Sequence, residues 1–250
     1  MQDLKQKTFT KKLVVQSSES DSNKKLKPFS FLCNAQELAN EHAERLGFGY
    51  DELIKHNCAW VLSRIKVKFL ATPKWQDVYN LTTWHKGMEG LFSLRDFSAT
   101  SEQDSTTPII SATTSWLIID LTTRRIVRAD HLFGEDIFQT AHLENALPSS
   151  CGKLVTPKEM EKSFSHSVRI SDIDMNQHTN NAKYIEWAFD VLPFEVVKEK
   201  DVDEFQINYS KETKLGDTID FYMSNSDNQV FWIEGRRDNE LIFQTVIKFK

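Results

Sequence analysis

One order of predicted elements occurs twice along this chain. Alternating and helical hydrophobic patterns predict a strand over Thr8–Gln16 and a helix over Phe31–Leu46, and then a strand over Phe164–Ser171 and a helix over Thr179–Leu192. A run of strands follows each helix. A helix beside an antiparallel sheet buries its apolar stripe against the sheet, and two such units can pair edge to edge, which removes one exposed strand edge from each. The sequence therefore predicts an α+β fold built from two tandem repeats.

The predicted strands are rich in β-branched and aromatic residues and are separated by polar, Gly or Pro breaks. They cover Cys58–Phe69, Asp77–Trp84, Leu91–Ala99 and Ile109–Asp120 in the first half, with a short continuation over Thr122–Val127, and Glu204–Lys211, Thr218–Asn225, Gln229–Arg236 and Glu240–Lys248 in the second half. Between the halves the pattern is lost. We therefore expect an N-terminal repeat over 1–137, a linker over 138–162 and a C-terminal repeat over 163–250.

Composition excludes several classes of protein. Of the 250 residues, 40% are hydrophobic and 27% are charged, as in an ordinary globular chain and unlike a disordered or collagenous one. The formal net charge of −5 argues against a nucleic-acid partner, because such binders are normally basic.

The cysteines and the lengths of the apolar runs indicate the cellular compartment in which the protein is expected. The three cysteines, Cys33, Cys58 and Cys151, form no CxxC motif and cannot all pair, so we expect a reducing compartment, the cytoplasm. No stretch reaches eighteen apolar residues, so we expect no membrane insertion. The start of the chain, MQDLKQKTFTKKLVV, reads as neither a secretory signal nor a transit peptide. We expect a soluble, cytoplasmic protein.

The densest polar segment, DIDMNQHTNN over 172–181, lies between a predicted strand and a predicted helix. Alternation there places Asp174, Asn176 and His178 on one side. A histidine can exchange a proton near neutral pH, and N–H groups at the helix start near Thr179 and Asn180 can stabilise a developing oxyanion. The segment is a candidate catalytic site.

This segment has two other interpretations: a purely structural capping role, which stays open, and a metal site, which the sequence disfavours. Asp and Asn are common capping and turn residues, so capping alone is the structural alternative. Asp and His also bind metals, but the chain has no HExxH, no CxxC and no paired-His spacing. We therefore predict no metal and no cofactor.

Longer segments carry a resemblance to a known family. DIDMNQHTNNAKYIEWAFD, AWVLSRIKVKFLATPKWQDVYNLTTW and SATTSWLIIDLTTRRIVR resemble, in order, the His-containing loop and helix, the strand pair with its Pro-x-Trp-x-Asp bend, and the Trp-bearing strand of the acyl-acyl carrier protein thioesterases. These are the plant FatA/FatB type and their bacterial relatives. The similarity runs from about residue 30 to the end of the chain.

The resemblance implies a double hotdog fold and hydrolysis of the thioester that joins a fatty acyl chain to acyl carrier protein. Asp174, Asn176 and His178 match the family's Asp, Asn and His, and Glu212 matches a Glu in its C-terminal half. Many plant members have a Cys after that Glu, where this chain has Thr213. We therefore expect attack by water, with Asp174 or Glu212 as the general base, and structural roles for the cysteines.

The first half lacks the Asp-x-Asn-x-His pattern, so one active site per chain is expected. Its His42 is interpreted as a packing residue, and the half as a whole is expected to shape the acyl pocket. Large side chains available to line that pocket are Trp60, Trp75, Trp84, Met88 and Phe92, although such residues in strands more often belong to the core.

The expected partner is acyl carrier protein, an acidic protein that would dock on basic side chains. Candidates are Arg124, Arg125 and Arg128, or Lys66 and Lys68. Rival functions are an acyl-CoA thioesterase on the same fold, a non-catalytic acyl-binding module and, less well supported, a dehydratase. The chain is expected to be a monomer or a homodimer, and the sequence leaves the length and saturation of the acyl group open.

Overall fold

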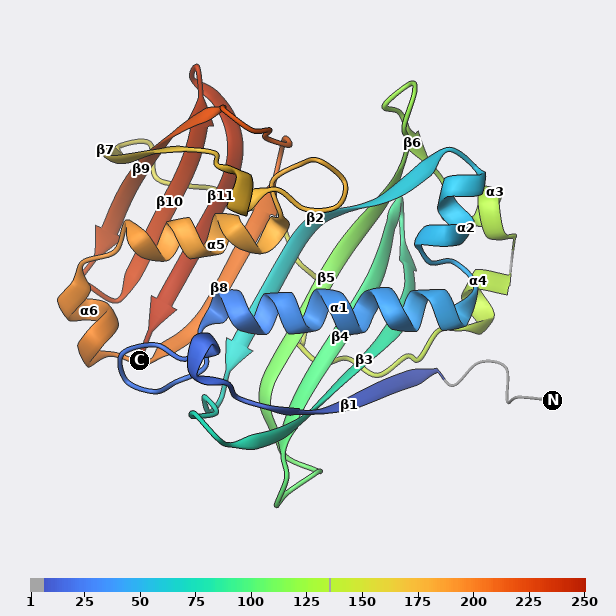
Figure 1. Ribbon diagram of the computed structural model, residues 1–250, viewed down its shortest axis with the longest axis horizontal. Coiled ribbons are helices and arrows are strands. Elements are labelled where there is room, and N and C mark those ends of the chain that lie inside the picture. Colours follow the sequence, from blue (N-terminus) through green and yellow to red (C-terminus); the bar gives the residue numbers. More distant parts are fainter. Residues whose placement is uncertain (1–6, 135) are drawn as a thin grey trace.

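The computed structural model describes residues 7–134 and 136–250. The first half contains β1 (Thr8–Val14), α1 (Pro28–Leu46), α2 (Tyr50–Lys55), β2 (Cys58–Phe69), β3 (Val78–Glu89), β4 (Phe92–Ser101), β5 (Pro108–Asp120), β6 (Ile126–Val127), α3 (Ala129–Phe133) and α4 (Asp136–Gln139) (Figure 1). The second half contains β7 (Glu161–Ser167), α5 (Asn181–Asp190), α6 (Phe194–Glu199), β8 (Val202–Tyr209), β9 (Thr218–Ser226), β10 (Val230–Arg237) and β11 (Glu240–Phe249). Short 3-10 turns lie at Ser17–Glu19 and Ile170–Asp172.

The strands form a single sheet that runs through both halves. Its order is β1-β3-β4-β5-β2-β8-β11-β10-β9-β7, with β6 paired to β5. The halves meet where β2 pairs antiparallel with β8, in a register that places Val67 opposite Phe205. This pairing removes one exposed edge from each repeat, as expected.

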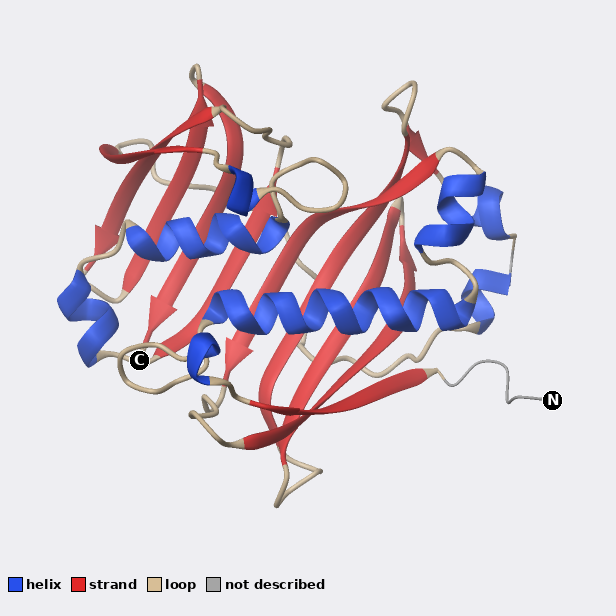
Figure 2. Ribbon diagram, in the orientation of Figure 1, coloured by secondary structure: helices blue, strands red, loops and turns tan. Residues whose placement is uncertain are grey.

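The two longest helices, α1 and α5, lie on the same face of the sheet (Figure 2). α1 begins with Pro28 at its first turn and ends at Gly47, whose φ of 83° is in the left-handed region that a glycine adopts without strain. α5 is capped by Asn180, whose side chain accepts a hydrogen bond from the Ala182 N–H at 2.9 Å. The start of α5 is therefore fixed next to the predicted site.

One hydrophobic core spans both repeats. Phe31 and Leu38 of α1 and Ile185 of α5 belong to the same buried cluster. At the junction the rings of Phe69 and Phe205 have centroids 6.1 Å apart. The repeats therefore share their core, and neither buries its apolar surface alone.

The segment expected to be a linker packs against the sheet. The N–H of Ala146 donates to Asp96 Oδ2 at 2.9 Å, and the Trp84 indole donates to the carbonyl oxygen of Glu144 at 2.9 Å. Arg95 of β4 contacts His42 of α1, so its side chain is on the face that α1 covers. The next residue, Asp96, points to the opposite face, because side chains alternate along a strand. The segment that binds Asp96 therefore lies on the face opposite α1. Further along, Gln206 of β8 donates to the carbonyl oxygen of Gly152 at 2.7 Å. The segment thus crosses from one repeat to the other behind the sheet.

Several predicted boundaries were wrong by a few residues. The strand predicted over Phe164–Ser171 is β7, which begins at Glu161 and ends at Ser167 because a 3-10 turn follows. The second helix begins at Asn181, since Thr179 pairs with Ile173 in an isolated bridge and cannot be helical. The short helices α2, α3, α4 and α6 were not predicted, because each has too few residues for a helical period to show.

Candidate active site

The predicted catalytic loop is a tight turn closed on itself. The N–H of Asp174 donates to the carbonyl oxygen of His178 at 2.9 Å, and the N–H of Gln177 donates to the carbonyl oxygen of Asp174 at 3.0 Å. Asp174 Oδ1 also accepts from the Asn176 N–H at 2.8 Å. Gln177 has a φ of 64°, which the turn requires. The alternation expected for Asp174, Asn176 and His178 is therefore absent, because the chain turns here instead of extending.

Thr213 ties this loop to the segment that carries Glu212. Its side chain is fully buried, and its hydroxyl lies 2.7 Å from the Thr179 hydroxyl and 2.9 Å from that of Tyr184. Its carbonyl oxygen accepts from the Thr179 N–H at 2.9 Å. Burial is the largest cause of the raised pKa of Tyr184, so its phenol stays protonated and able to donate. These bonds fix Glu212 beside the turn.

His178 and Glu212 come together at this place. His178 Nε2 lies 3.6 Å from Glu212 Oε2, and both side chains are partly exposed. The same Oε2 pairs with the guanidinium of Arg124, which projects from the connection between β5 and β6 in the first repeat. Among the described residues, Glu212 Oε1 has no hydrogen-bond partner. Glu212 Oε2 is thus bonded by Arg124 and faces His178 at a longer distance, while Oε1 is left without such a bond.

The four predicted catalytic residues are not equally placed. The structure brings His178 and Glu212 together and places Asp174 opposite His178 in the turn, linked through the backbone. Asn176 is exposed at the tip of the turn, and within residues 7–134 and 136–250 its side chain makes no hydrogen bond to the other three. Among the described residues, Glu212 is the carboxylate at ion-pair distance from the imidazole, whereas Asp174 Oδ1 is engaged by a backbone N–H.

The expected oxyanion donors are already engaged. The Thr179 N–H donates to Thr213, and the Asn180 N–H donates to the carbonyl oxygen of Asp172 at 2.8 Å. Neither can therefore stabilise an oxyanion as predicted. The first N–H of α5 without a partner among the described residues is that of Asn181, at the positive end of the helix dipole.

A polar cluster around the buried Asp172 lies next to the start of α5. Asp172 is buried, and its Oδ2 accepts from the Arg169 N–H at 2.8 Å and lies 3.0 Å from His166 Nε2. The His166 ring packs on the Trp187 indole, with centroids 4.3 Å apart. Because Asp172 also binds the Asn180 N–H through its carbonyl oxygen, this cluster fixes the entry of the chain into α5.

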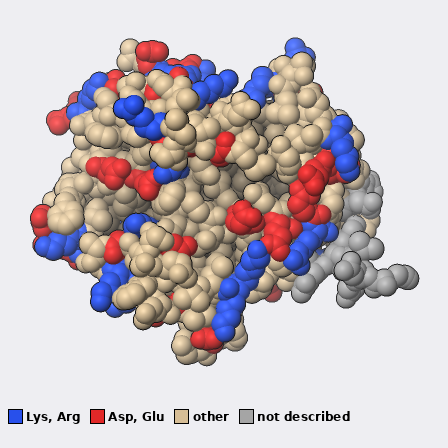
Figure 3. All heavy atoms as spheres, in the orientation of Figure 1, with Lys and Arg blue, Asp and Glu red and all other residues tan. Residues whose placement is uncertain are grey.

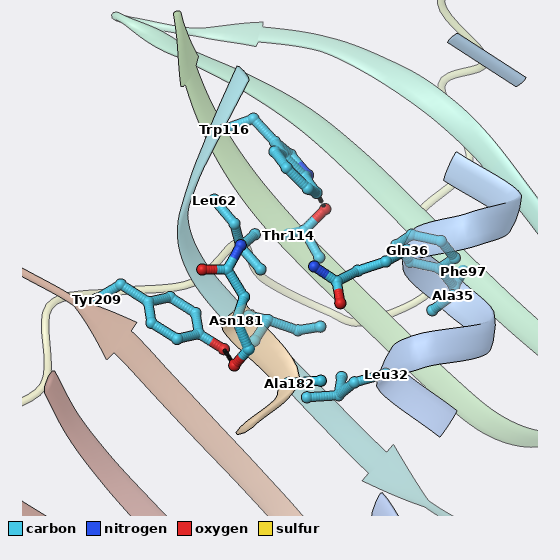
Figure 4. A pocket seen from close by; sticks show the side chains of 11 residues that line it. Leu32, Ala35, Gln36, Leu62, Phe97, Thr114, Trp116, Asn181, Ala182 and Tyr209 are labelled. Carbon is cyan, nitrogen blue, oxygen red and sulfur yellow. Dashed lines mark hydrogen bonds between the residues drawn. The ribbon is translucent and has the colours of Figure 1, made fainter. Parts of the chain in front are cut away.

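A small cavity lies between α1, the sheet and the start of α5 (Figure 4). Its volume is about 10 Å³, room for a single water. Apolar side chains and a few polar groups line it: Leu32, Ala35, Gln36, Leu62, Ile65, Phe97, Thr114, Trp116, Asn181, Ala182 and Tyr209. The Tyr209 hydroxyl donates to the carbonyl oxygen of Asn181 at 2.9 Å, which joins this cavity to the start of α5.

A second cavity of about 40 Å³ continues along α1 and shares Trp116 with the first. Of the aromatic residues proposed to line an acyl pocket, Trp60 lines this cavity. Trp75 is largely exposed, and the Trp84 indole bonds to the segment behind the sheet. Trp116, which lines both cavities, was not among the residues predicted to line the pocket, although the sequence segment that contains it was singled out.

A larger cavity, about 450 Å³, lies at the other end of α5. Its apolar floor includes Phe29, Phe69 and Phe189, and both acidic and basic side chains stand around it. None of the four predicted catalytic residues lines it. It is therefore separate from the candidate site.

The cysteines are poor nucleophiles. Burial raises the pKa of Cys33 to about 11 and that of Cys151 to about 12, and it also raises the pKa of Cys58. The residue that follows Glu212 is the buried Thr213, whose hydroxyl is taken up by two hydrogen bonds. The geometry gives no Cys–His pair among the described residues.

Replacing all three cysteines tests this directly. We expect Cys33→Ser, Cys58→Ser and Cys151→Ser together to leave kcat within roughly threefold of wild type, because no thiol lies at the site. Some stability is lost, since burying a hydroxyl in place of a thiol costs about 1–3 kcal/mol where no hydrogen bond forms. Turnover is measured below the unfolding temperature of the variant, and a loss of activity in the folded variant would contradict the prediction.

The basic residues considered for docking differ in their pairing. Lys68 pairs with Asp203 at 2.6 Å and Lys66 with Glu204 at 3.3 Å, so the strand lysines are matched by acidic neighbours. Arg128 pairs with Asp130 at 2.6 Å. On the face shown in Figure 3, Lys and Arg are interspersed with Asp and Glu. Arg124 pairs with Glu212, so Arg125 is the one candidate of the five without an acidic side-chain partner among the described residues.

Two further features concern ligands and membranes. In the described part of the chain, no three His, Cys, Asp or Glu side chains gather as a metal site would require. None of the helices within residues 7–134 and 136–250 has the length and apolarity to cross a membrane.

Comparisons with known proteins match both halves of the chain. A family model described as the acyl-ACP thioesterase N-terminal domain matches residues 6–135, and one described as the C-terminal domain matches residues 155–248. The chain is 28% identical over 233 residues to an oleoyl-acyl carrier protein thioesterase of Arabidopsis thaliana, which covers 85% of this chain and 62% of that protein. It is 24% identical over 241 residues to a palmitoyl-acyl carrier protein thioesterase of Gossypium hirsutum, covering 88% of this chain and 55% of that protein. The chain thus spans about three fifths of the length of the curated relatives it matches.

Solved structures agree with the expected fold. An acyl-ACP thioesterase from Bacteroides thetaiotaomicron superposes with a TM-score of 0.88 at 25% identity, covering 98% of both chains. A 12:0-ACP thioesterase from Umbellularia californica has a TM-score of 0.84 at 20% identity, covering 97% of both chains. The prediction of an α+β double hotdog is confirmed.

Proposed function

Because the chain belongs to the acyl-ACP thioesterase family, we propose that it hydrolyses the thioester between a fatty acyl chain and acyl carrier protein. The products are a free fatty acid and the carrier thiol. The observation that supports this most is the His178–Glu212 pair at 3.6 Å, held beside the start of α5 by the buried Thr213. An imidazole and a carboxylate in this position can serve acid–base chemistry, which capping alone does not require.

The proposed reaction uses water as the nucleophile. Glu212 Oε1 accepts a proton from a water molecule, whose oxygen attacks the thioester carbonyl carbon. The negative charge that develops on the carbonyl oxygen is stabilised by the Asn181 N–H at the start of α5. The tetrahedral intermediate then expels the thiolate, which takes up a proton. His178 orients the Glu212 carboxylate and passes the proton that Glu212 took from water on to the thiolate, which returns both side chains to their starting states.

In the proposed site, Asp174 holds the turn in shape, and Asn176 lies at its exposed surface. Asp174 accepts the Asn176 N–H and donates its own N–H to His178, so it holds the turn that carries the imidazole. Asn176 stands exposed at the tip, where it can meet the incoming thioester or its carrier. Both residues thus belong to the proposed site in different roles from Glu212.

The acyl chain enters between α1 and the sheet of the first repeat. The cavities there begin at Asn181 and continue past Trp116 towards Trp60, so they lead from the start of α5 into apolar surroundings. Their volumes of about 10 and 40 Å³ are too small for a fatty chain. We therefore expect side chains along α1 and Trp116 to move when the chain binds.

The proposed partner is acyl carrier protein, and no nucleic acid takes part. The three free cysteines fit a reducing compartment such as the cytoplasm. A monomer or a homodimer suits the fold, because the β2–β8 pairing already joins two repeats within one chain. The main alternative is an acyl-CoA thioesterase, since the same chemistry acts on either thioester.

A substrate panel tests the proposal. Acyl-ACP and acyl-CoA thioesters of matched chain length are incubated with wild type and with His178→Ala, and released fatty acid is measured. We expect kcat/KM to be higher for the carrier substrates and His178→Ala to lower it by roughly 100-fold or more. Preference for CoA would support the alternative. Tight acyl binding without turnover would instead support a binding module.

A further inference from the structure

Arg124 links the two repeats at the candidate site. It belongs to the connection between β5 and β6 in the first repeat, whereas Glu212 follows β8 in the second, 88 residues later in the chain. The pair joins the Arg124 guanidinium to Glu212 Oε2, the oxygen that also faces His178. The first repeat therefore supplies a charged group to a site whose other candidates all come from the second.

The turn that carries Arg124 is closed by several hydrogen bonds. Asp120 Oδ1 accepts from the N–H groups of Thr122 and Thr123 at 3.0 and 2.6 Å, and its carbonyl oxygen accepts from the Arg124 N–H at 2.9 Å. The Asn57 side chain adds a bond to the Thr122 hydroxyl at 2.9 Å. Arg124 has a φ of 58°, a conformation that costs a non-glycine residue free energy and that is often kept where function needs it.

The other partner is equally constrained. Glu212 precedes Thr213, whose backbone and hydroxyl are fixed by Thr179 and Tyr184. A guanidinium on one rigid turn therefore meets a carboxylate on another rigid segment. The contact therefore joins two backbone segments that are each fixed by their own hydrogen bonds. With Oε2 occupied, Oε1 is the oxygen presented to water.

We propose that Arg124 is a positioning residue for thioester hydrolysis, and that the active site is built from both repeats. By binding Glu212 Oε2, Arg124 directs Oε1 towards the attacking water and keeps the carboxylate beside His178. This inference depends on the proposed role of Glu212 as the general base. The competing role is docking of the acidic carrier, because the Arg124 side chain is 48% exposed.

The two roles predict different kinetic changes. Loss of a positioning residue lowers kcat, because the misplaced base affects the chemical step with any acyl donor. Loss of a docking residue raises KM for acyl-ACP and leaves kcat unchanged. Arg125 is a matched control, because it is the next residue of the same turn with the same charge and has no side-chain partner among the described residues.

The experiment measures kcat and KM for acyl-ACP with wild type, Arg124→Gln, Arg124→Lys, Arg125→Gln and Glu212→Gln. We expect Arg124→Gln to lower kcat by roughly 10- to 100-fold, since displacing a catalytic group by about 1 Å costs up to about 100-fold. Arg124→Lys should recover part of the loss, because it restores the charge. Arg125→Gln should keep kcat within about twofold of wild type, and a change in its KM would report docking alone. Thermal unfolding of each variant shows that the fold is kept.

Two results overturn the inference, and they are distinct from failure of the proposed function. Unchanged kcat in Arg124→Gln, with or without a raised KM, would show that Arg124 does not position the base. An equal loss of kcat in Arg125→Gln would show that the charge of the turn matters and not the Glu212 contact. Full activity in Glu212→Gln would instead refute the proposed role of Glu212 itself.

Discussion

Replacing Glu212 by Gln is expected to lower kcat for acyl-ACP hydrolysis by roughly 100- to 10,000-fold, the usual contribution of a general base. The amide keeps the size of the carboxylate but cannot take a proton from water. KM should change little, since Glu212 acts on the chemical step. Initial rates of thiol release, measured over a range of acyl-ACP concentrations, give both parameters.

A control separates this effect from a general loss of charge. Glu199 is an exposed carboxylate on α6 that contributes nothing to the candidate site, so Glu199→Gln should have wild-type kinetics. If Glu212→Gln turned over like wild type, another group would have to be the base. Asp174→Asn would then be the next variant to test, because Asp174 is the remaining carboxylate of the turn.

Phe205→Ala is expected to lower the free energy of unfolding by about 3–5 kcal/mol, as for other fully buried phenylalanines. Phe205 is fully buried on β8, where it lies opposite Val67 of β2 and packs against the Phe69 ring. Its removal leaves a cavity where the two repeats meet. Urea unfolding followed by far-UV circular dichroism and by tryptophan fluorescence measures the loss.

The two signals also test whether the repeats unfold together. Because they share one sheet and one core, both signals should give the same midpoint in wild type and in Phe205→Ala. The exposed Phe194 on α6 is the control, and Phe194→Ala should change stability by about 0.5 kcal/mol or less. Two separated transitions in wild type would show that the repeats are independent folding units.

The order of elements could be predicted from the sequence because it depends on local periodicity. The long helix over Phe31–Leu46 and the strand over Cys58–Phe69 are long enough for their periods to be clear, and both are present. The end of each element depends on caps and bridges, such as the Ile173–Thr179 bridge that delays the start of α5. Such contacts leave little trace in hydrophobic patterns.

Part of the candidate site could be predicted because its residues are close together in the sequence. The pattern Asp174, Asn176, His178 is contiguous and could be recognised, and the resemblance added Glu212. The role now proposed for Arg124 could not be found this way, because its contact with Glu212 exists only once β2 and β8 pair and bring two distant turns together. The engagement of the Thr179 and Asn180 N–H groups likewise depends on Thr213 and Asp172, which the helix pattern does not include.

The most direct test of the account is a single turnover with enzyme in excess over acyl-ACP. Carrier thiol, free fatty acid and the intact mass of the protein are measured in the same samples. Attack by water predicts one thiol and one free fatty acid for each thioester consumed, with no acylated protein at any time. Thiol release accompanied by an acyl group on the protein would contradict water attack, and an intact thioester would contradict hydrolysis.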